Sequence, residues 1–415
     1  METTHSEKRN NFTEYVFPNS NLLDNHLEMS GENPLIVPLK KIINDDAFTN
    51  TDYELPVAVG VDTAKKAKVI DLATAPHILV GGSIGQGKTI FLHSVIISLL
   101  YKKRPDELKF ILIDPHQFDF MPYARLKKHF LAVTTDAANE NNAMAATPRQ
   151  AKSALQSLCN EMDERYKLTS SASADNIKTY NEKYAKGLLN PDESHRFLPY
   201  IVAIIDDYNP LISTHNLTPY IMQLVQKGEA VGIHLIVATK RAELLLPTIK
   251  ANFPVKIAFR TCTIIDSRAI LGKDGAERLN GIGDMWYLSE TGMERIQGAY
   301  VDVAEISNVA SFISTQPQTS IFKLAPANEL PDNSSQNDRR DELFDKATKL
   351  VSKKKCCSPS MLQRHLDAGY YRACRILEQL EDAGIVGTAA YDETRPVLIK
   401  TSYRRNHKKK NDEKA

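Results

Sequence analysis

The stretch Gly82-Ser83-Ile84-Gly85-Gln86-Gly87-Lys88-Thr89 decides the fold of this chain. It fits G-x-x-x-x-G-K-[ST], a loop whose backbone N–H groups curl around phosphate oxygens because glycine permits the necessary conformations. The apolar run at 77–80 predicts a preceding strand, and residues 91–100 predict a following helix whose N-terminal dipole attracts anions. We therefore expect a nucleotide site in which Lys88 contacts the β- and γ-phosphates and Thr89 binds Mg²⁺.

A second buried run supplies the acids that such a site needs. Residues 201–205 are apolar and end in Asp206-Asp207. In open α/β sheets, ligands lie beyond the carboxyl ends of the strands. Asp206 is predicted to hold Mg²⁺ through water, and Asp207 to orient or deprotonate the attacking water. Such an acid alone is also explained as a turn residue that caps the next helix, but with the phosphate loop the pair predicts an ATP and Mg²⁺ site.

Further apolar runs extend the alternation of strands and helices away from the loop. Strands are expected at 109–113, which ends in Asp114, and at 235–238, which ends in Thr239; a helix is expected at 149–166. Apolar strands that alternate with helices predict an α/β fold with a parallel sheet covered on both faces.

Length and composition fit a soluble protein of two or three domains. The chain has 415 residues, of which 42% are hydrophobic and 25% charged. No apolar run approaches the ~18 residues of a membrane span, and the N-terminus resembles no secretory signal. The five cysteines form no C-x-x-C pair, which predicts a reducing, cytoplasmic location. The net charge of +1 does not by itself indicate a nucleic-acid partner.

Changes in composition divide the chain into five parts. Residues 1–33 are polar and are expected to form a flexible arm, and residues 34–315 form the nucleotide-binding domain with a short lead-in. Residues 316–340 are rich in Pro, Asn, Ser and Gln and predict a linker. Residues 341–400 form a small second domain, and residues 401–415 form a solvated basic tail.

The run 369–381 is the most informative part of the second domain. Ser358-Pro359 predicts a helix start, and Gly369 predicts the tight turn into a second helix. In that helix an apolar stripe at helical spacing predicts the buried face: Ala373, Ile376, Leu377 and Leu380. The outward residues are Tyr371, Arg372, Arg375 and Gln379. Arg and Gln suit guanine and adenine in a DNA major groove, although a plain solvated helix face is the alternative.

An ordered set of motifs resembles the motor region of the FtsK/SpoIIIE family of DNA translocases. It includes Ala75–Gly82, Asn160–Lys167, Gly232–Leu235, Gly281–Met285 and Gly298–Asp302. Residues 369–381 are similar to the winged-helix module of the same family. The resemblance implies a RecA-like P-loop ATPase domain with a parallel sheet, followed by a small winged-helix domain. It also implies a homo-hexameric ring on double-stranded DNA, through which ATP hydrolysis drives the duplex.

The resemblance further implies roles for several basic residues. In the family, a basic residue of the neighbouring subunit completes the ATP site; Arg268 is the first candidate and Arg260 the second, with a surface salt bridge as the alternative for both. Lys240, Arg241 and Lys250 lie around a loop that faces the pore in the family. All three are candidates for contacts with DNA phosphates, which position a duplex without reading its sequence.

Four residues depart from the family pattern. Asp207 stands where the family has Glu, Lys240 where it has the Gln that senses the γ-phosphate, His116 where it has Lys, and Tyr371 where it has Asn. The shorter Asp207 matters because the positioning of an attacking water is sensitive to about 1 Å. Nucleotide binding is expected because the phosphate loop is intact, whereas hydrolysis depends on Asp207 and Lys240.

Two functions of different classes remain open at this point. The first is an active double-stranded DNA translocase in DNA transfer or segregation, with a recombinase or a mobile-element protein as a further partner. The second is an ATP-binding ring or scaffold on DNA with weak or no hydrolysis. A helicase-like enzyme acting on single strands is disfavoured, because aromatic residues for base stacking are not evident.

Overall fold

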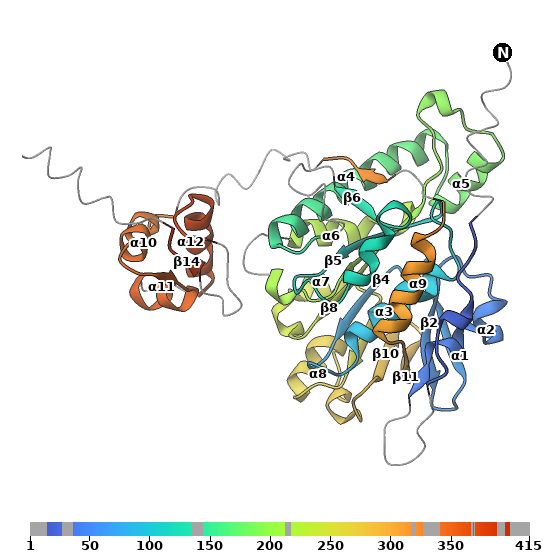
Figure 1. Cartoon of the computed structure of the whole chain (residues 1–415), viewed down its shortest axis with the longest axis horizontal. Helices are drawn as coiled ribbons and strands as arrows, with labels where there is room; N and C mark the ends of the chain where they lie inside the picture. The colour runs from blue at the N-terminus through green and yellow to red at the C-terminus, as the bar shows by residue number, and fades with distance from the viewer. Residues whose placement is uncertain are drawn as a thin grey trace, which may run out of the picture. The chain divides into compact units, whose positions relative to one another are not determined.

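The computed structural model describes residues 15–26, 36–134, 144–211, 217–317, 321–326, 341–366, 368, 370–387 and 395–398. The chain divides into two units, Met1–Asn328 and Glu329–Ala415 (Figure 1). Each unit has its own hydrophobic core, so the division into a large nucleotide-binding domain and a small C-terminal domain follows from packing.

A ten-stranded mixed sheet forms the centre of the first unit (Figure 1). Its strands follow the order β3 (Ala67–Asp71), β2 (Pro56–Asp62), β11 (Gly292–Tyr300), β10 (Asp284–Ser289), β9 (Val255–Phe259), β4 (His77–Gly81), β8 (Ile233–Thr239), β7 (Tyr200–Ile205) and β5 (Leu108–Ile113), with β1 (Val37–Pro38) beside β11. Strands β9, β4, β8, β7 and β5 run parallel to one another. Strands β10, β11, β2 and β3 extend this sheet by antiparallel pairing, an extension that the sequence did not predict.

The parallel strands are covered on both faces, as their continuous apolar sequences predict. Alternate side chains of β4 and β5 enter two different cores because successive residues of a strand point to opposite faces. Ile78 and Phe110 pack in the core that contains helix α3 (Lys88–Leu100), whereas Leu79 and Ile111 pack in the core that contains α4 (Pro148–Ser171).

Helices cover the sheet and connect its strands. The remaining helices of the first unit are α1 (Leu39–Ile43), α2 (Asp46–Thr49), α5 (Ile177–Ala185), α6 (Thr218–Lys227), α7 (Pro247–Ala251), α8 (Ile264–Leu271) and α9 (Val303–Ser314). A further short parallel pair joins β6 (Ala132–Thr134) to β12 (Phe322–Leu324). In the part of the chain that the structure describes, none of the helices has the length and apolar character needed to cross a membrane.

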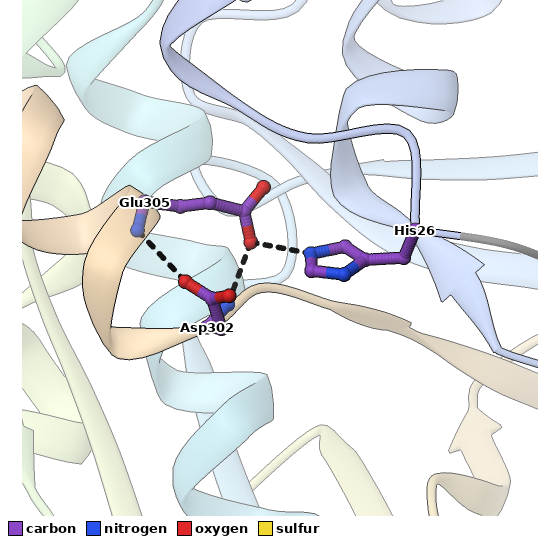
Figure 2. A group of neighbouring side chains, drawn as sticks. All are labelled: His26, Asp302 and Glu305. Atoms are coloured by element: carbon purple, nitrogen blue, oxygen red, sulfur yellow. Dashed lines mark hydrogen bonds and ion pairs between the residues drawn. The ribbon is translucent and has the colours of Figure 1, made fainter.

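The N-terminal segment 15–26 is anchored to the first unit. Leu23 is fully buried in the core beside α3. His26 Nε2 lies 2.8 Å from a carboxylate oxygen of Glu305, and Glu305 in turn forms a capping box with Asp302 at the start of α9 (Figure 2). The expectation of a flexible arm over residues 1–33 is therefore wrong for residues 15–26. The polar composition of this segment did not predict its packing, because the packing depends on one buried leucine and a few hydrogen bonds rather than on an apolar pattern.

The prediction that a linker covers residues 316–340 is also wrong for the first residues of that range. The Gln316 side-chain amide donates to the Val16 carbonyl at 2.8 Å and accepts from the Val16 N–H at 2.9 Å. Residues Phe322–Leu324 then form β12, and Leu324 is buried. Residues 316, 317 and 321–326 therefore belong to the first unit, because strand pairing across the fold gives them partners that composition does not reveal.

The second unit packs three helices against a small antiparallel pair. Its elements are α10 (Phe344–Val351), α11 (Pro359–Leu366), α12 (Tyr370–Asp382), β13 (Cys356–Cys357) and β14 (Arg395–Pro396). The Ser358 hydroxyl accepts from the Met361 N–H, which confirms Ser358 as the cap of α11. The predicted buried stripe of α12 is confirmed, since each of its four residues is at most 1% exposed: Ala373, Ile376, Leu377 and Leu380.

Three buried histidines of the first unit predict a loss of stability in mild acid. Burial lowers the pKa of His77 to about 3 and the pKa values of His93 and His234 to about 4. The unfolded chain binds protons at these sites below about pH 6.5 and the folded chain does not, so the stabilisation is present above pH 6.5 and is lost as the pH falls. Between pH 6.5 and 5 we expect each histidine to lower the free energy of unfolding by about 2 kcal/mol, measured by urea denaturation.

The control for this prediction is His234→Asn, which retains a donor for the Pro76 carbonyl that His234 Nδ1 contacts. The variant should lose less stability than the parent between the two pH values, whatever its stability at pH 7. An unchanged difference between the two pH values would show that His234 takes up no proton on unfolding.

Candidate nucleotide site

The phosphate loop lies at the carboxyl edge of β4, as the sequence predicts. β4 ends at Gly81, α3 begins at Lys88, and the loop turns between them. Gly82 and Gly87 have φ values of 146° and 119°, which favour glycine. A Cβ atom at Gly82 would also approach the Cβ of Phe259 to 2.8 Å. The glycines thus allow the loop to pack against β9 and leave its backbone open to a ligand.

Lys88 is held inside this loop. Its Nζ donates hydrogen bonds of 2.7 Å to the carbonyls of Gly82 and Ser83, and the residue is 7% exposed. Burial lowers the pKa of Lys88 to about 8, although the Asp207 carboxylate acts in the opposite direction. An incoming phosphate supplies negative charge to this desolvated ammonium group and can replace the two carbonyl acceptors.

Three carboxylates gather beside Thr89. The Thr89 hydroxyl donates to Asp206 at 3.0 Å, and carboxylate oxygens of Asp114, Asp119 and Asp206 lie within 4.8 Å of one another. Burial raises the pKa of Asp206, and the neighbouring Asp119 carboxylate raises it further. Burial likewise raises the pKa of Asp119, with Asp114 as the next cause. This set of hard oxygen donors fits Mg²⁺, whose binding would relieve the repulsion between the acids.

Sequence reasoning did not identify Asp119 as a site residue. The Asp114 carboxylate accepts from the backbone N–H groups of His116, Gln117 and Phe120, and these bonds fold the segment after β5 back toward β7. That turn carries Asp119 to Asp206. An aspartate at the end of a strand, followed by a second acid five residues later, was the available signal, but only the turn shows that the two converge.

The other predicted acid, Asp207, is tied to two basic side chains. Lys240 Nζ donates to its carboxylate at 2.9 Å, and His116 Nε2 lies 3.1 Å from the same oxygen. Lys240 and His116 are themselves 3.3 Å apart, and the Asp207 side chain is 3% exposed. The site thus brings Lys240 and His116 to Asp207, a contact that the sequence did not predict.

One cavity of about 450 Å³ lies at this site, a volume typical of small-molecule sites. Its lining includes a charged and polar set beside the phosphate loop: Lys88, Thr89, His116, Asp119, Asp206 and Lys240. It also includes residues of the paired strands β1 and β11, among them Tyr300. The lining therefore combines a charged set suited to phosphates with a largely apolar set.

The two arginines considered for action across a subunit boundary lie outside this cavity. Arg268 is on α8, its side chain is 63% exposed, and its guanidinium pairs with Asp274. Arg260 is exposed and follows β9, where its carbonyl accepts the Ser83 N–H at 2.9 Å. In the part of the chain that the structure describes, neither arginine contacts the acids of its own site.

The residues predicted to contact DNA differ in their exposure and in their hydrogen-bond partners. Arg241 is exposed and pairs with Glu243, and Lys250 is half-buried on α7. In the second unit, Arg372 makes three hydrogen bonds to the Asp341 carboxylate, and the Gln379 side chain accepts from the Asp341 N–H. Arg372 and Gln379 therefore fix the start of this unit as well as lying on α12. The side chains of Tyr371 and Arg375 lie outside the described residues.

Two solved structures share the fold of the first unit in large part. The monomer form of the pCW3 conjugation coupling protein TcpA with ATPgS matches with a TM-score of 0.54 and 22% identity, over 68% of this chain and 75% of that one. The cytoplasmic domain of the Type VII secretion ATPase EccC of Thermomonospora curvata matches with a TM-score of 0.55 and 21% identity, over 71% of this chain and 36% of that one. At these identities the likeness concerns the fold alone.

Sequence comparison is more specific. The DNA translocase FtsK of Chlorobaculum tepidum is 36% identical over 399 residues, which are 92% of this chain and 48% of that protein. The DNA translocase SftA of Bacillus subtilis is 34% identical over 383 residues, which are 91% of this chain and 38% of that protein. The chain thus spans less than half the length of these two relatives. The profile of the FtsK/SpoIIIE family matches residues 38–243, and that of the FtsK gamma domain matches residues 338–400. This chain is a member of the FtsK/SpoIIIE family.

Proposed function

We propose that this chain is the motor of an ATP-dependent double-stranded DNA translocase. The observation that carries the proposal is the cavity lined by Lys88, Thr89, Asp206 and Lys240 at the carboxyl edge of the sheet, with Asp207 paired to Lys240. Membership of a family whose relatives are named DNA translocases supports duplex DNA as the substrate that is moved.

Different residues of the site would carry out different parts of ATP hydrolysis: phosphate binding, Mg²⁺ binding and orientation of the attacking water. The loop Gly82–Thr89 binds the phosphates through its backbone, and Lys88 exchanges its two carbonyl acceptors for phosphate oxygens. Thr89, Asp206 and Asp119 would hold Mg²⁺, which when bound offsets negative charge that develops on the phosphates. Asp207 orients the attacking water and accepts its proton.

The Lys240–Asp207 ion pair gives this site a resting state. While Lys240 pairs with Asp207, the carboxylate is engaged by the lysine and not by water. A γ-phosphate offers Lys240 a more highly charged partner in the same cavity. Movement of Lys240 to the phosphate would release Asp207 for the water, so hydrolysis would begin only after the triphosphate has entered.

Assembly and DNA contacts form the remaining part of the proposal. A homo-hexameric ring would bring Arg268 of one subunit to the ATP site of the next, where it would exchange Asp274 for a phosphate. Arg241 and Lys250 would contact DNA phosphates, and α12 of the C-terminal domain would contact the duplex through Arg372, Gln379 and their neighbours. A cytoplasmic location and a recombinase or mobile-element partner remain predictions.

The test is steady-state ATP hydrolysis by the purified chain with and without linear duplex DNA, at low and moderate salt. A translocase should show turnover that duplex DNA stimulates at least about tenfold, with stimulation weakening as salt screens phosphate contacts. Tight ATP binding without stimulated turnover would instead support the second candidate, an ATP-binding ring on DNA. The observation that favours that candidate is the double engagement of Asp207 by Lys240 and His116.

A further inference from the structure

Besides the phosphate loop, the cavity has a wall made by two paired strands. There β1 runs beside the end of β11, with Val37 opposite Ala299 and Pro38 opposite Tyr300. Val37, Ala299 and Tyr300 line the cavity from this wall. If phosphates occupy the loop, as the proposed function requires, we expect the base of the nucleotide to lie against this wall.

One polar side chain, Gln297 on β11, lines the cavity in this region. Its Nε2 donates a hydrogen bond of 2.9 Å to the carbonyl of Ile282. This contact fixes which way the amide faces, because the flipped amide would oppose two oxygen atoms. The Gln297 Oε1 therefore stays an acceptor, and among the described residues no donor engages it.

The Ile282 carbonyl is placed by an unusual backbone. Ile282 has a φ of 50°, a left-handed value that is rare for a β-branched residue, and it lies between Gly281 and Gly283. The Gly283 N–H donates to the Gln86 carbonyl, so this turn is also hydrogen-bonded to the phosphate loop. Such strain is kept where the surrounding structure has a use for it. Here it holds the carbonyl that orients the Gln297 amide in the wall of the cavity.

Tyr300 belongs to the same wall of the cavity. The His26 ring meets the Tyr300 ring edge-on, with centroids 4.9 Å apart. His26 is itself held by Glu305, which also accepts the backbone N–H of Asp302 (Figure 2). The other carboxylate oxygen of Glu305 accepts the backbone N–H of Asp24. The N-terminal segment thus supports an aromatic ring that lines the cavity, and flat aromatic rings pack well on purine bases.

We propose that this wall is an adenine subsite in which Gln297 Oε1 accepts a hydrogen bond from the exocyclic amine and Tyr300 packs on the base. Guanine carries a carbonyl oxygen at the corresponding ring position. That oxygen would face Gln297 Oε1 with no proton between them, so guanine would leave two acceptors unpaired. The inference rests on the proposed function and goes further, because it assigns the choice of ATP over GTP to one side chain.

The experiment measures dissociation constants of ATP and GTP for the full chain by competition against a fluorescent ATP analogue. The parent should bind ATP at least about tenfold more tightly than GTP. Gln297→Met has similar volume and no acceptor oxygen, and its ratio of the two constants should approach one. The ratio is taken on a single preparation, so partial unfolding of the variant changes both constants equally and leaves the ratio intact.

Gln316→Met is the matched control. Gln316 also binds backbone through its amide, but it lies against Val16 outside the cavity. Its variant should keep the base preference of the parent. A parent that binds ATP and GTP equally, or a Gln297→Met variant that keeps the parental ratio, would overturn the adenine subsite while leaving the ATPase proposal in place. Failure of the parent to bind either nucleotide would overturn both.

Discussion

Replacing Lys88 with alanine abolishes ATP hydrolysis and weakens ATP binding by about 100-fold. The Lys88 ammonium is desolvated and makes two hydrogen bonds to carbonyls of the loop it must share with the phosphates. Charge-assisted hydrogen bonds to phosphate in such surroundings are worth about 1.5–3 kcal/mol each. Equilibrium binding of ATP and DNA-stimulated hydrolysis, measured on the same variant, check the two parts of this prediction.

Lys109 provides a matched control for Lys88. Lys109 is also a buried lysine, and it lies on β5 of the first unit. Its Nζ donates to the His129 carbonyl, and burial lowers its pKa to about 8. It does not line the nucleotide cavity. Lys109→Met should therefore retain the ATP affinity of the parent. If Lys88→Ala and Lys109→Met lowered affinity by the same factor, the effect would belong to the loss of a buried lysine rather than to phosphate binding.

Replacing Asp207 with asparagine should lower the rate of hydrolysis by at least about 100-fold and preserve ATP binding. Asparagine keeps the size of Asp207 but cannot take a proton from water. It also removes the ion pair with Lys240, which leaves that lysine free for the γ-phosphate. We therefore expect ATP affinity to stay the same or to increase. Single-turnover hydrolysis and equilibrium binding separate the two effects.

Asp207→Glu is the companion variant, because it keeps the charge and lengthens the side chain by one methylene group. It should retain or raise the activity of the parent. Hydrolysis by Asp207→Asn at the parental rate would show that Asp207 only anchors Lys240. Activity that appears in Asp207→Glu and is absent from the parent would favour the ATP-binding ring over the translocase.

The core of the nucleotide site could be predicted from the sequence because its signals are local. The phosphate loop joins a buried strand to a buried helix within a few residues, and backbone conformation there depends on the glycines themselves. Asp206 and Asp207 end a continuous apolar strand, and parallel strands bring their carboxyl ends to one edge. The spacing of apolar residues on α12 likewise fixed its buried face.

Other features depended on pairings between distant segments, which no local pattern encodes. The antiparallel strands β10 and β11 extend the sheet and bring Gln297 and Tyr300 to the cavity. The segment 15–26 reads as polar and is nevertheless anchored through Glu305, far along the chain. Arg372 was assigned to DNA from its outward position, whereas its guanidinium also binds Asp341.

The sequence by itself determined that a phosphate loop, a pair of acids at a strand end and a C-terminal amphipathic helix exist, because each is written in consecutive residues. The tertiary structure decided which side chains surround them. It brought Asp119 to Asp206, set His116 and Lys240 on the same oxygen of Asp207, and turned the Gln297 amide by means of Ile282. The physical reason is that hydrogen bonds and ion pairs act over a few ångströms, and only the folded chain brings these groups within that distance.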